Sequence, residues 1–429
     1  MKKNTIKIVS LGCSKNLVDS EVLMGQIQAN GLELVANEDD ESDIVIINTC
    51  GFIKDAEEES IDTILNYAQA KKNGKVQKVI VMGCLSERYT KELKAEMPDI
   101  DNIYGVNDIP QIVKDLGAIY KKELIGERKV STPSHFAYFK ISEGCNHSCA
   151  FCAIPGIRGK HKSRSMESLI DEAQRLASKG VKELIMIAQD LTYYGVDNYG
   201  KKMLGNLLEK LAYVEGIEWI RLHYAYPTQF PEDVLSLMAS NSKICKYLDI
   251  PLQHNDDRIL KSMRRSHNSK SNRELVAKFR EMVPGLTIRT TFIVGFPGET
   301  DEEFEHLKDF VREMRFDRVG VFTYSHEEDT HAFSLEDNVP QKVKDRRAAE
   351  LMQIQEEISL EKNLEKVGKT FKVIVDRLED NFYVGRTEGD SYEVDNEVLI
   401  SSQIDLQIGE FYNVEITDAE TFDIFGIIK

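Results

Sequence analysis

The sequence predicts an α/β fold in three domains: a parallel α/β sheet domain (1–125), a partial (β/α)6 barrel (135–365) and a small β-barrel (366–429). Three observations support this division. At 429 residues the chain is too long for a single hydrophobic core. Short β-branched runs alternate with helical segments as far as a long charged segment at 343–366. Beyond that segment, short apolar runs are separated by turn residues, which is typical of a small barrel.

In the first domain, three short β-branched runs are the predicted strands, and each ends in turn residues: Thr5–Leu11, Ser42–Asn48 and Gln77–Met82. Between the last two lies a predicted helix, Lys54–Lys72, which opens with acidic residues. This order predicts a parallel sheet with helical crossovers. The segment 131–134, Ser-Thr-Pro-Ser, is the predicted linker to the next domain.

A second alternation of strands and helices predicts six βα units that form a partial barrel related to the (β/α)8 design. Predicted helices include Ser165–Lys179 and Ser271–Met282. In such barrels the chemistry lies at the carboxyl ends of the strands. The predicted strands are Tyr138–Ser142, Lys182–Ala188, Glu218–His223, Lys246–Ile250, Thr287–Val294 and Gly320–Thr323.

The segment 343–366 is a predicted charged helix with a narrow apolar stripe, because Ala348, Leu351, Gln355 and Ile358 recur at three and four residues. The tail then changes character, and its turn-separated short runs predict a five-stranded barrel. These runs are Phe371–Val375, Tyr383–Arg386, Glu397–Ile400, Phe411–Ile416 and Ile424–Ile428.

Composition narrows the class of protein. No apolar run approaches the ~20 residues of a membrane span, and the first residues turn into a strand without the apolar region of a signal peptide. We therefore expect a cytoplasmic protein without membrane contact, in which seven cysteines point to metal binding rather than to disulfides, although Cys245 is most simply a packed residue without a role. The net charge of −17 disfavours broad nucleic-acid binding and favours a basic partner.

Three cysteines lie on one short segment with the spacing C-x3-C-x2-C: Cys145, Cys149 and Cys152, here called the loop trio. Three thiolates so spaced can hold three irons of a 4Fe–4S cube and leave the fourth iron open to a small molecule. The alternative is a structural zinc site, which needs a fourth ligand and usually pairs its cysteines as two C-x2-C hooks. His147 is available, but it lies inside the loop, where its geometry is poor.

Three further cysteines each follow an apolar strand: Cys13, Cys50 and Cys84, here called the strand-end trio. The carboxyl ends of parallel strands emerge at one edge of a sheet, so we expect the three thiols to converge on a shared ligand there. Adjacent glycines, Gly12, Gly51 and Gly83, allow tight turns beside a bulky group. The alternative is that all three are small buried apolar residues.

The loop trio, with an aromatic residue before its last cysteine, resembles that of the radical S-adenosylmethionine (SAM) enzymes. With the three-cysteine domain before it and a TRAM-like barrel after it, nearly the whole chain resembles the methylthiotransferases. The segment 10–21 resembles the branch that modifies the β-carbon of an aspartate in small-subunit ribosomal protein number twelve, although Ser14 replaces that branch's usual proline. The other branch modifies an adenosine of transfer RNA. Further matching segments are Ile154–Arg164, Ala188–Gly195, Trp219–Pro227, Leu248–His254 and Arg289–Glu299.

The resemblance implies two 4Fe–4S clusters and SAM as cofactors. The loop trio would hold the catalytic cluster that cleaves SAM to a 5′-deoxyadenosyl radical, and the strand-end trio an auxiliary cluster that carries sulfur. One SAM would methylate that sulfur, and the radical from a second would remove the β-hydrogen of the aspartate. Radical chemistry suits a saturated carbon, which offers no acidic or electrophilic handle. The implied partners are the basic ribosomal protein, an electron donor such as flavodoxin or ferredoxin, and a sulfur donor.

The resemblance also implies contacts to SAM. One lies in the cysteine loop, a glycine and a glutamate lie where relatives bind the methionine amino group, and an arginine offers a forked contact to the carboxylate. Two glutamines end predicted strands and point to the barrel mouth. The glycine equally suits the end of the preceding helix. The six residues are Phe151, Gly180, Glu183, Arg164, Gln189 and Gln253.

The net charge of the C-terminal tail distinguishes between the two candidate substrates, a basic ribosomal protein and transfer RNA. Between Lys366 and Lys429 the tail carries six Lys and Arg against fourteen Asp and Glu, a net charge of −8. Affinity for RNA depends largely on cations that face phosphates, so direct RNA binding by this tail is not expected. Acidic residues that only keep the surface soluble are the alternative explanation. The transfer-RNA activity and a non-catalytic iron–sulfur or zinc protein remain the two competing functions.

Overall fold

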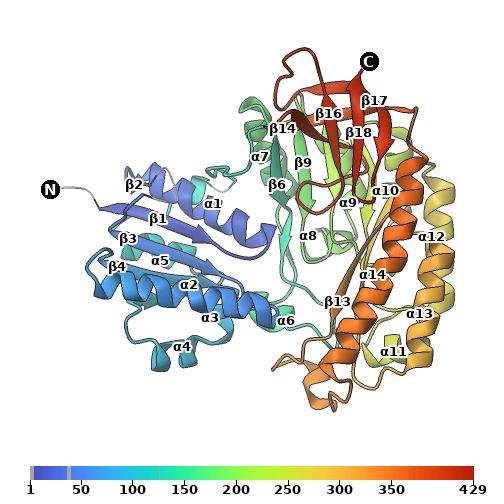
Figure 1. The fold of residues 1–429 in the computed structure, drawn as a ribbon. Helices are drawn as coiled ribbons and strands as arrows, with labels where there is room; N and C mark the ends of the chain where they lie inside the picture. Colours follow the sequence, from blue (N-terminus) through green and yellow to red (C-terminus); the bar gives the residue numbers. More distant parts are fainter. Residues whose placement is uncertain (1–3, 36–39, 125) are drawn as a thin grey trace.

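A computed structural model describes residues 4–35, 40–124 and 126–429 of the chain. It contains a five-stranded sheet, a six-stranded sheet that curves into a partial barrel, and a closed five-stranded barrel. Figure 1 shows the first sheet beside the partial barrel and the closed barrel near the C-terminus. The predicted α/β fold class, with a terminal small β-barrel, is confirmed.

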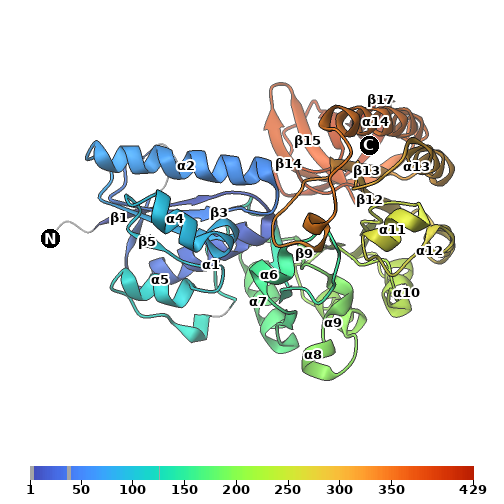
Figure 2. The same ribbon diagram turned by 90° about the horizontal axis from the view of Figure 1, so that it is seen from below.

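The N-terminal sheet has the strand order β2-β1-β3-β4-β5, and all of its pairs are parallel. Helices α1 and α5 pack on one face and α2 on the other (Figures 1 and 2). Because both faces are covered, the central strand β3 is buried along its whole length, as parallel strands usually are. The elements are β1 Thr5–Ser10, α1 Ser14–Ala29, β2 Glu33–Leu34, β3 Ile44–Thr49, α2 Lys54–Lys72, β4 Lys78–Gly83, α3 Cys84–Arg88, α4 Thr90–Glu96, β5 Asn102–Ile103 and α5 Ile109–Asp115.

The partial barrel has six parallel strands in the order β13-β12-β11-β10-β9-β6. Its main core lies between these strands and the helices outside them. The strands are β6 Phe136–Lys140, β9 Glu183–Ile187, β10 Trp219–Leu222, β11 Ile244–Asp249, β12 Thr287–Val294 and β13 Arg318–Thr323. The helices are α6 Ile154–Arg158, α7 Met166–Ser178, α8 Val196–Tyr199, α9 Leu204–Ala212, α10 Glu232–Ser240, α11 Asp257–Ser262, α12 Ser269–Met282 and α13 Asp301–Met314, and a short β-ribbon pairs β7 Ser142–Glu143 with β8 Lys162–Ser163.

Helix α14 (Gln341–Leu364) joins the partial barrel to the closed barrel. Leu351 and Ile358 from the predicted apolar stripe are buried in the main core. Near its end the helix side chains of Ser359 and Asn363 donate hydrogen bonds to the backbone of the closed barrel. That barrel consists of β14 Thr370–Glu379, β15 Phe382–Thr387, β16 Glu397–Ser401, β17 Phe411–Ala419 and β18 Asp423–Ile428.

The closed barrel docks against the inner face of the partial barrel through buried charges. Arg386 of β15 pairs with Glu183 of β9 at 2.8 Å and with Asp376 of β14 at 2.6 Å. The loop after β15 supplies Asp395, which pairs with Arg289 of β12 at 2.8 Å. The same loop supplies Asp390 and Ser391, which contact Arg318 and His223. Part of the tail's negative charge therefore neutralises arginines of the partial barrel.

Replacing Arg386 with alanine is expected to destabilise the protein by about 3 kcal/mol, because two buried carboxylates lose a partner. Thermal or urea unfolding of the reconstituted protein measures this loss. A matched control is Lys372→Ala, which removes an exposed ion pair to Glu218 across the same domain boundary. Exposed pairs contribute about 0–1 kcal/mol. Equal losses for the two variants would contradict a structural role for the buried arginine.

In the described part of the chain, no helix is both long and apolar enough to cross a bilayer.

Candidate functional site

The loop trio lies just beyond the carboxyl end of β6, at the mouth of the partial barrel. Backbone hydrogen bonds fix the loop: Ala150 donates to Met263 at 2.9 Å and accepts from Ala332 at 2.7 Å. Gly144 begins the loop with a φ of +77°, and a Cβ on it would lie 2.3 Å from the carbonyl oxygen of Lys160. Only glycine fits this turn, so the backbone is specifically shaped to present the cysteines.

The three loop thiols are close enough for their charges to interact. Burial is the main cause that raises the pKa of Cys145 to about 11 and that of Cys152 to about 12. The charges of Asp190 and then Cys149 raise the pKa of Cys145 further, and those of Cys149 and Cys145 raise that of Cys152. None of the three is in a disulfide. Thiolates crowded in this way repel one another, and a bound iron cluster removes the repulsion and displaces the protons. Their donor chemistry fits a cluster.

Polar side chains surround the loop. Arg265 donates from Nη1 to Cys149 Sγ at 3.3 Å and lies over the ring of Tyr226 at 4.3 Å. His147 stacks on the same ring at 3.7 Å, and its Nε2 lies 2.8 Å from Asp190 Oδ2. His147 is therefore held away from the position of a fourth metal ligand. A guanidinium beside a cysteine sulfur is one of the features that tune the potential of a cluster.

The strand-end trio converges at the carboxyl edge of the N-terminal sheet, as predicted from the sequence. A Cβ on Gly12 would lie 2.8 Å from Cys50 Sγ, so the loop before Cys13 touches Cys50. Asn16 of α1 links the strand ends, because its Nδ2 donates to Leu11 and Thr49 backbone oxygens at 3.0 Å. Its Oδ1 lies 3.6 Å from Cys84 Sγ. One side chain thus connects the ends of β1, β3 and β4.

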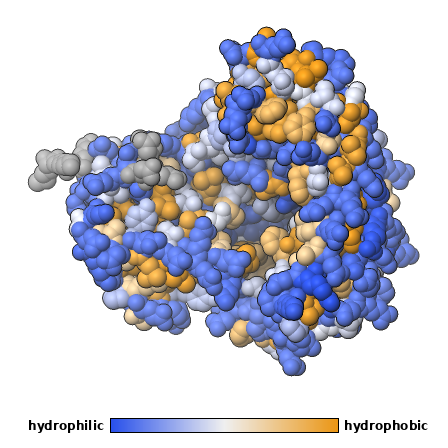
Figure 3. Space-filling view, in the orientation of Figure 1, coloured by the Kyte–Doolittle hydropathy of each residue, from blue (hydrophilic) through white to orange (hydrophobic). Residues whose placement is uncertain are grey.

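The electrostatics of this trio also fit a metal cluster. Burial is the main cause that raises the pKa of Cys84 to about 12, and the charges of Cys13 and Cys50 raise it further. At Cys13 burial acts in the same direction, but Lys15, Arg158 and backbone N–H groups outweigh it and lower the pKa. Cys13 nevertheless keeps exposed surface, so its thiol lies in a recess. Figure 3 shows the molecular surface hollowed between the N-terminal domain and the other two.

The two trios lie on either side of one boundary between the first two domains. Cys84 packs with Ala153 and Ile157, which directly follow the loop trio in the chain. Arg158, also on α6, is 3% exposed and donates to Asn16 Oδ1 at 2.5 Å. Its charge reaches both Cys13 and Cys84.

Carboxylates hold this boundary together. Arg158 pairs with Asp19 of α1 at 3.2 Å and with Glu143 of β7 at 2.9 Å. Lys140 of β6 contacts the same two carboxylates. Although burial opposes it, the charges of Lys140 and then Arg158 lower the pKa of Glu143 to about 2. The carboxylate therefore stays ionised and ties the two cysteine sites into one rigid unit.

Within 4–35, 40–124 and 126–429, no three His, Cys, Asp or Glu side chains surround a single metal-ion position. In a 4Fe–4S cube each thiolate binds a different iron, so the thiols lie around a group larger than one ion. The thiols of each trio are therefore related by their mutual charge interactions and contacts rather than by a common distance to one ion.

Two of the predicted SAM contacts carry unsatisfied buried atoms at the mouth of the partial barrel. Gln189 follows β9 and Gln253 follows β11, and the Oε1 atom of each is buried without a hydrogen-bond partner. Gln189 Nε2 donates to Glu143 Oε1 at 2.7 Å, which orients its side chain. Phe151 packs beside the loop against Phe296 and Tyr324. Buried acceptors without partners are costly, so these positions suit a polar ligand such as SAM.

Two other predicted contacts are not brought to the mouth. Glu183 is the first residue of β9, at the amino end of the barrel, where it is fully buried and paired with Arg221 and Arg386. Gly180 ends α7 on the same side, with a φ of +97° and its N–H bonded to Ala177. This placement corrects the prediction, because the cysteine loop follows the opposite ends of the strands. Arg164 lies closer to the mouth, since its Nη1 donates to the carbonyl oxygen of Lys140, the last residue of β6, at 3.1 Å. Its Nη2 is buried without a hydrogen-bond partner, but the guanidinium pairs with Glu172 of α7 at 2.5 Å, so its charge is already compensated.

Three family models match the chain. The Radical SAM superfamily matches residues 139–311, the uncharacterised protein family UPF0004 matches 5–105, and the TRAM domain matches 367–428. The ribosomal protein uS12 methylthiotransferase RimO of Flavobacterium johnsoniae is 58% identical over 99% of this chain and 98% of its own. The proteins of the same name from Christiangramia forsetii and Cytophaga hutchinsonii are 56% and 54% identical, over 99% and 100% of this chain and 94% and 98% of their own.

The chain belongs to the RimO family of radical SAM methylthiotransferases.

Solved structures support the fold of this RimO-family chain. A radical SAM methyltransferase, TsrM from Kitasatospora setae, superposes with a TM-score of 0.57 at 14% identity, over 75% of this chain and 73% of that one. The cobalamin-dependent SAM radical enzyme OxsB superposes with a TM-score of 0.52 at 13% identity, over 82% and 56% of the two chains. At these identities the likeness concerns the fold alone.

Sequence reasoning missed the residues that join the two sites of the RimO-family chain. Asn16, Glu143 and Arg158 lie beside cysteines in the sequence, but their roles depend on contacts between the first and second domains. The available signal was weak: Glu143 and Arg158 are charged residues flanking an apolar loop. Charged residues in such a place usually need partners, which is a reason to expect an ion pair.

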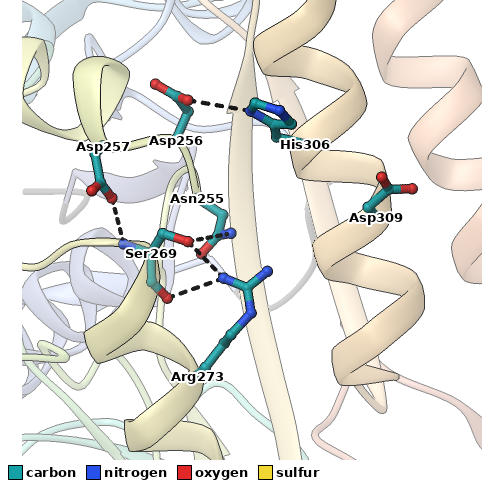
Figure 4. A pocket seen from close by; sticks show the side chains of 7 residues that line it. All are labelled: Asn255, Asp256, Asp257, Ser269, Arg273, His306 and Asp309. Carbon is teal, nitrogen blue, oxygen red and sulfur yellow. Dashed lines mark hydrogen bonds and ion pairs between the residues drawn. The ribbon is translucent and has the colours of Figure 1, made fainter.

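A surface pocket of about 430 Å³ lies on the outer side of the RimO-family barrel (Figure 4). Asp257 accepts from the backbone N–H of Ser269, the Ser269 hydroxyl accepts from Arg273, and Asp256 pairs with His306 at 3.5 Å. Its polar groups thus largely satisfy one another. The cysteine trios, rather than this pocket, form the candidate active site. The pocket is lined by Asn255, Asp256, Asp257, Ser269, Arg273, His306 and Asp309.

Proposed function

We propose that this chain is a radical SAM methylthiotransferase that adds a methylthio group to the β-carbon of an aspartate in ribosomal protein uS12. The observation that carries the proposal is the agreement along the whole chain with proteins of that name, which are 53–58% identical over at least 99% of it. The two cysteine trios support the same reaction, which needs one site for SAM cleavage and one for sulfur.

The loop trio would hold the cluster that binds SAM, and the strand-end trio would hold a second 4Fe–4S cluster. When bound, these cofactors supply the radical that removes the β-hydrogen and the sulfur that replaces it. The unpaired Oε1 atoms of Gln189 and Gln253 would accept hydrogen bonds from SAM, and Phe151 would lie against its adenine. Arg265 would donate to the sulfur of Cys149 and stabilise the reduced cluster.

The rigid boundary between the trios has a chemical purpose. Arg158 and Asn16 link the strand-end trio to the helix after the loop trio, and Glu143 links that helix to Gln189. A radical reaction needs its two reacting centres at a fixed separation, since misplacement by about 1 Å can cost on the order of 10²-fold in rate. These residues therefore position both cofactors relative to one substrate carbon.

The tail favours a protein substrate over transfer RNA. Its net charge of −8 suits a basic ribosomal protein, which it would attract electrostatically. The buried acidic residues Asp376, Asp390 and Asp395 pair with arginines or histidine, and the remaining acids lie at the surface. We infer that an electron donor such as flavodoxin or ferredoxin and a separate sulfur donor complete the system.

An anaerobic assay tests the proposal. The reconstituted protein is incubated with SAM and dithionite, together with either purified uS12 or a transfer-RNA anticodon stem, and both substrates are analysed by mass spectrometry. We expect uS12 to gain one methylthio group in place of one hydrogen, on the β-carbon of an aspartate. A methylthio group on the RNA alone would replace the protein substrate with the RNA. Zinc instead of iron in the anaerobic protein would favour a non-catalytic scaffold.

A further inference from the structure

Lys15 brings a positive charge from beside the strand-end trio to the mouth of the partial barrel. It is the second residue of α1, two positions after Cys13. Its Nζ lies 3.3 Å from the centre of the Tyr224 ring, which belongs to the partial barrel. The side chain therefore crosses from the N-terminal domain to the mouth of the barrel, beside the strand-end trio.

Tyr224 is a rigid support for this lysine. It lies just after β10 with a φ of +62°, a conformation that is uncommon for a residue with a bulky side chain. Its carbonyl oxygen accepts from the backbone N–H of Leu191 at 3.1 Å, and its ring packs with buried residues of the barrel interior. Strained backbone that is fixed by its surroundings is concentrated at functional sites.

Neighbouring cations of this region have carboxylate partners, but Lys15 has none among the described residues. Lys140 and Arg158 both pair with Asp19 and Glu143. For the Lys15 ammonium group the contact to the Tyr224 ring is the one close interaction in the described part of the chain. An aromatic face stabilises a cation less than a carboxylate does, so this charge is incompletely compensated.

The charge of Lys15 influences ionisable groups at the ends of barrel strands. Burial chiefly raises the pKa of Asp249 and lowers that of His223, at the ends of β11 and β10, and the charge of Lys15 lowers both pKa values. Asp249 is buried, and its nearest cation is Arg289 at 3.9 Å. Lys15 thus lies within range of the strand-end trio on one side and of the barrel interior on the other.

We propose that Lys15 binds the side-chain carboxylate of the substrate aspartate, and that this contact makes the enzyme select aspartate over neutral residues. The inference rests on the proposed function and identifies the group that recognises its substrate. A carboxylate bound to Nζ would place the adjacent β-carbon next to the strand-end trio, where the sulfur is expected. A lysine ammonium suits this task because it is a compact point charge with three donors.

Binding measurements on the reconstituted, SAM-loaded enzyme test this proposal. The probe is a uS12 peptide that contains the aspartate modified by the wild-type enzyme, compared with the same peptide carrying asparagine there. Wild-type enzyme is expected to bind the aspartate peptide about tenfold more tightly than the asparagine peptide. Lys15→Gln is expected to remove this preference by weakening only the aspartate peptide, and Lys15→Arg to restore most of it.

Controls separate this role from folding and from the proposed function itself. Iron content and SAM cleavage without substrate are measured in each Lys15 variant to show whether the clusters are retained, and Lys270→Gln, an exposed lysine of α12, should bind both peptides as wild type does. Equal weakening of both peptides, an unchanged preference, or loss of iron in Lys15→Gln would overturn the proposal. Absence of any methylthio transfer to uS12 by the wild-type enzyme would instead contradict the proposed function.

Discussion

Replacing Cys149 with alanine is expected to abolish SAM cleavage by the reconstituted enzyme. The loop has three thiolates for three irons, and with two of them the cluster has too few protein ligands to be retained. Cys149 also receives the hydrogen bond from Arg265, so its loss leaves that guanidinium without a sulfur partner. Formation of 5′-deoxyadenosine should fall by a factor of at least about 10³, because loss of a group on which the whole reaction depends has effects of this size.

Chromatography of 5′-deoxyadenosine measures the rate, and iron and sulfide analysis measures the clusters. The matched control is Cys245→Ala, the same substitution at a buried cysteine of β11 that packs against Trp219 and Tyr247. That variant should keep its iron and cleave SAM, although it is somewhat less stable. Cleavage at the wild-type rate by the Cys149 variant would show that the loop trio does not hold the catalytic cluster.

The strand pattern of the sequence was sufficient to place both trios, for a physical reason. Parallel strands share a direction, so residues that follow them must lie at one edge of the sheet. The positions of Cys13, Cys50 and Cys84 directly after apolar runs therefore predicted their convergence. The same logic placed Gln189 and Gln253 at the barrel mouth.

The resemblance predicted a wrong position for Glu183, although the bounds of the predicted strand already indicated the right one. Its range, Lys182–Ala188, already put Glu183 at the start of the strand and hence at the end opposite the cysteine loop. The ion-pair partners of Arg164 and Glu183 were not predicted from the sequence. Glu183 pairs with Arg386, which lies 203 residues further along the chain, and no local pattern encodes such a contact.

The count of charged residues in the tail could not predict which of them are exposed. The acidic tail was predicted from composition, but composition does not separate exposed acids from buried ones. Asp390 and Asp395 pair with arginines of the partial barrel, and Asp376 pairs with Arg386 of its own barrel and with His135, so all three use their charge inside the molecule. The tail that meets solvent is therefore less acidic than the count of its residues, and electrostatic attraction of a basic protein depends on the surface acids alone.

Replacing Cys84 with alanine is expected to separate the two reactions of the enzyme. Cys84 belongs to the strand-end trio, so its loss should remove the second cluster while the loop trio, on another domain, keeps the first. Iron should fall from about eight to about four per chain. SAM cleavage to 5′-deoxyadenosine should continue, but methylthio transfer to uS12 should fall by a factor of at least about 10³.

The outcome depends on which trio carries the sulfur. Cys84 is 4% exposed and packs against Ala153 and Ile157 behind the loop trio, so a smaller side chain also loosens this contact. Val106→Ala, a substitution in the same apolar cluster that spares the thiol, is the matched control and should retain most of the transfer activity. If the Cys84 variant transfers methylthio groups as fast as this control, the sulfur is not supplied from the strand-end trio. If transfer stops while cleavage continues, the two functions reside on two separate sets of thiolates, because both variants loosen the same apolar cluster and only one of them removes a thiol.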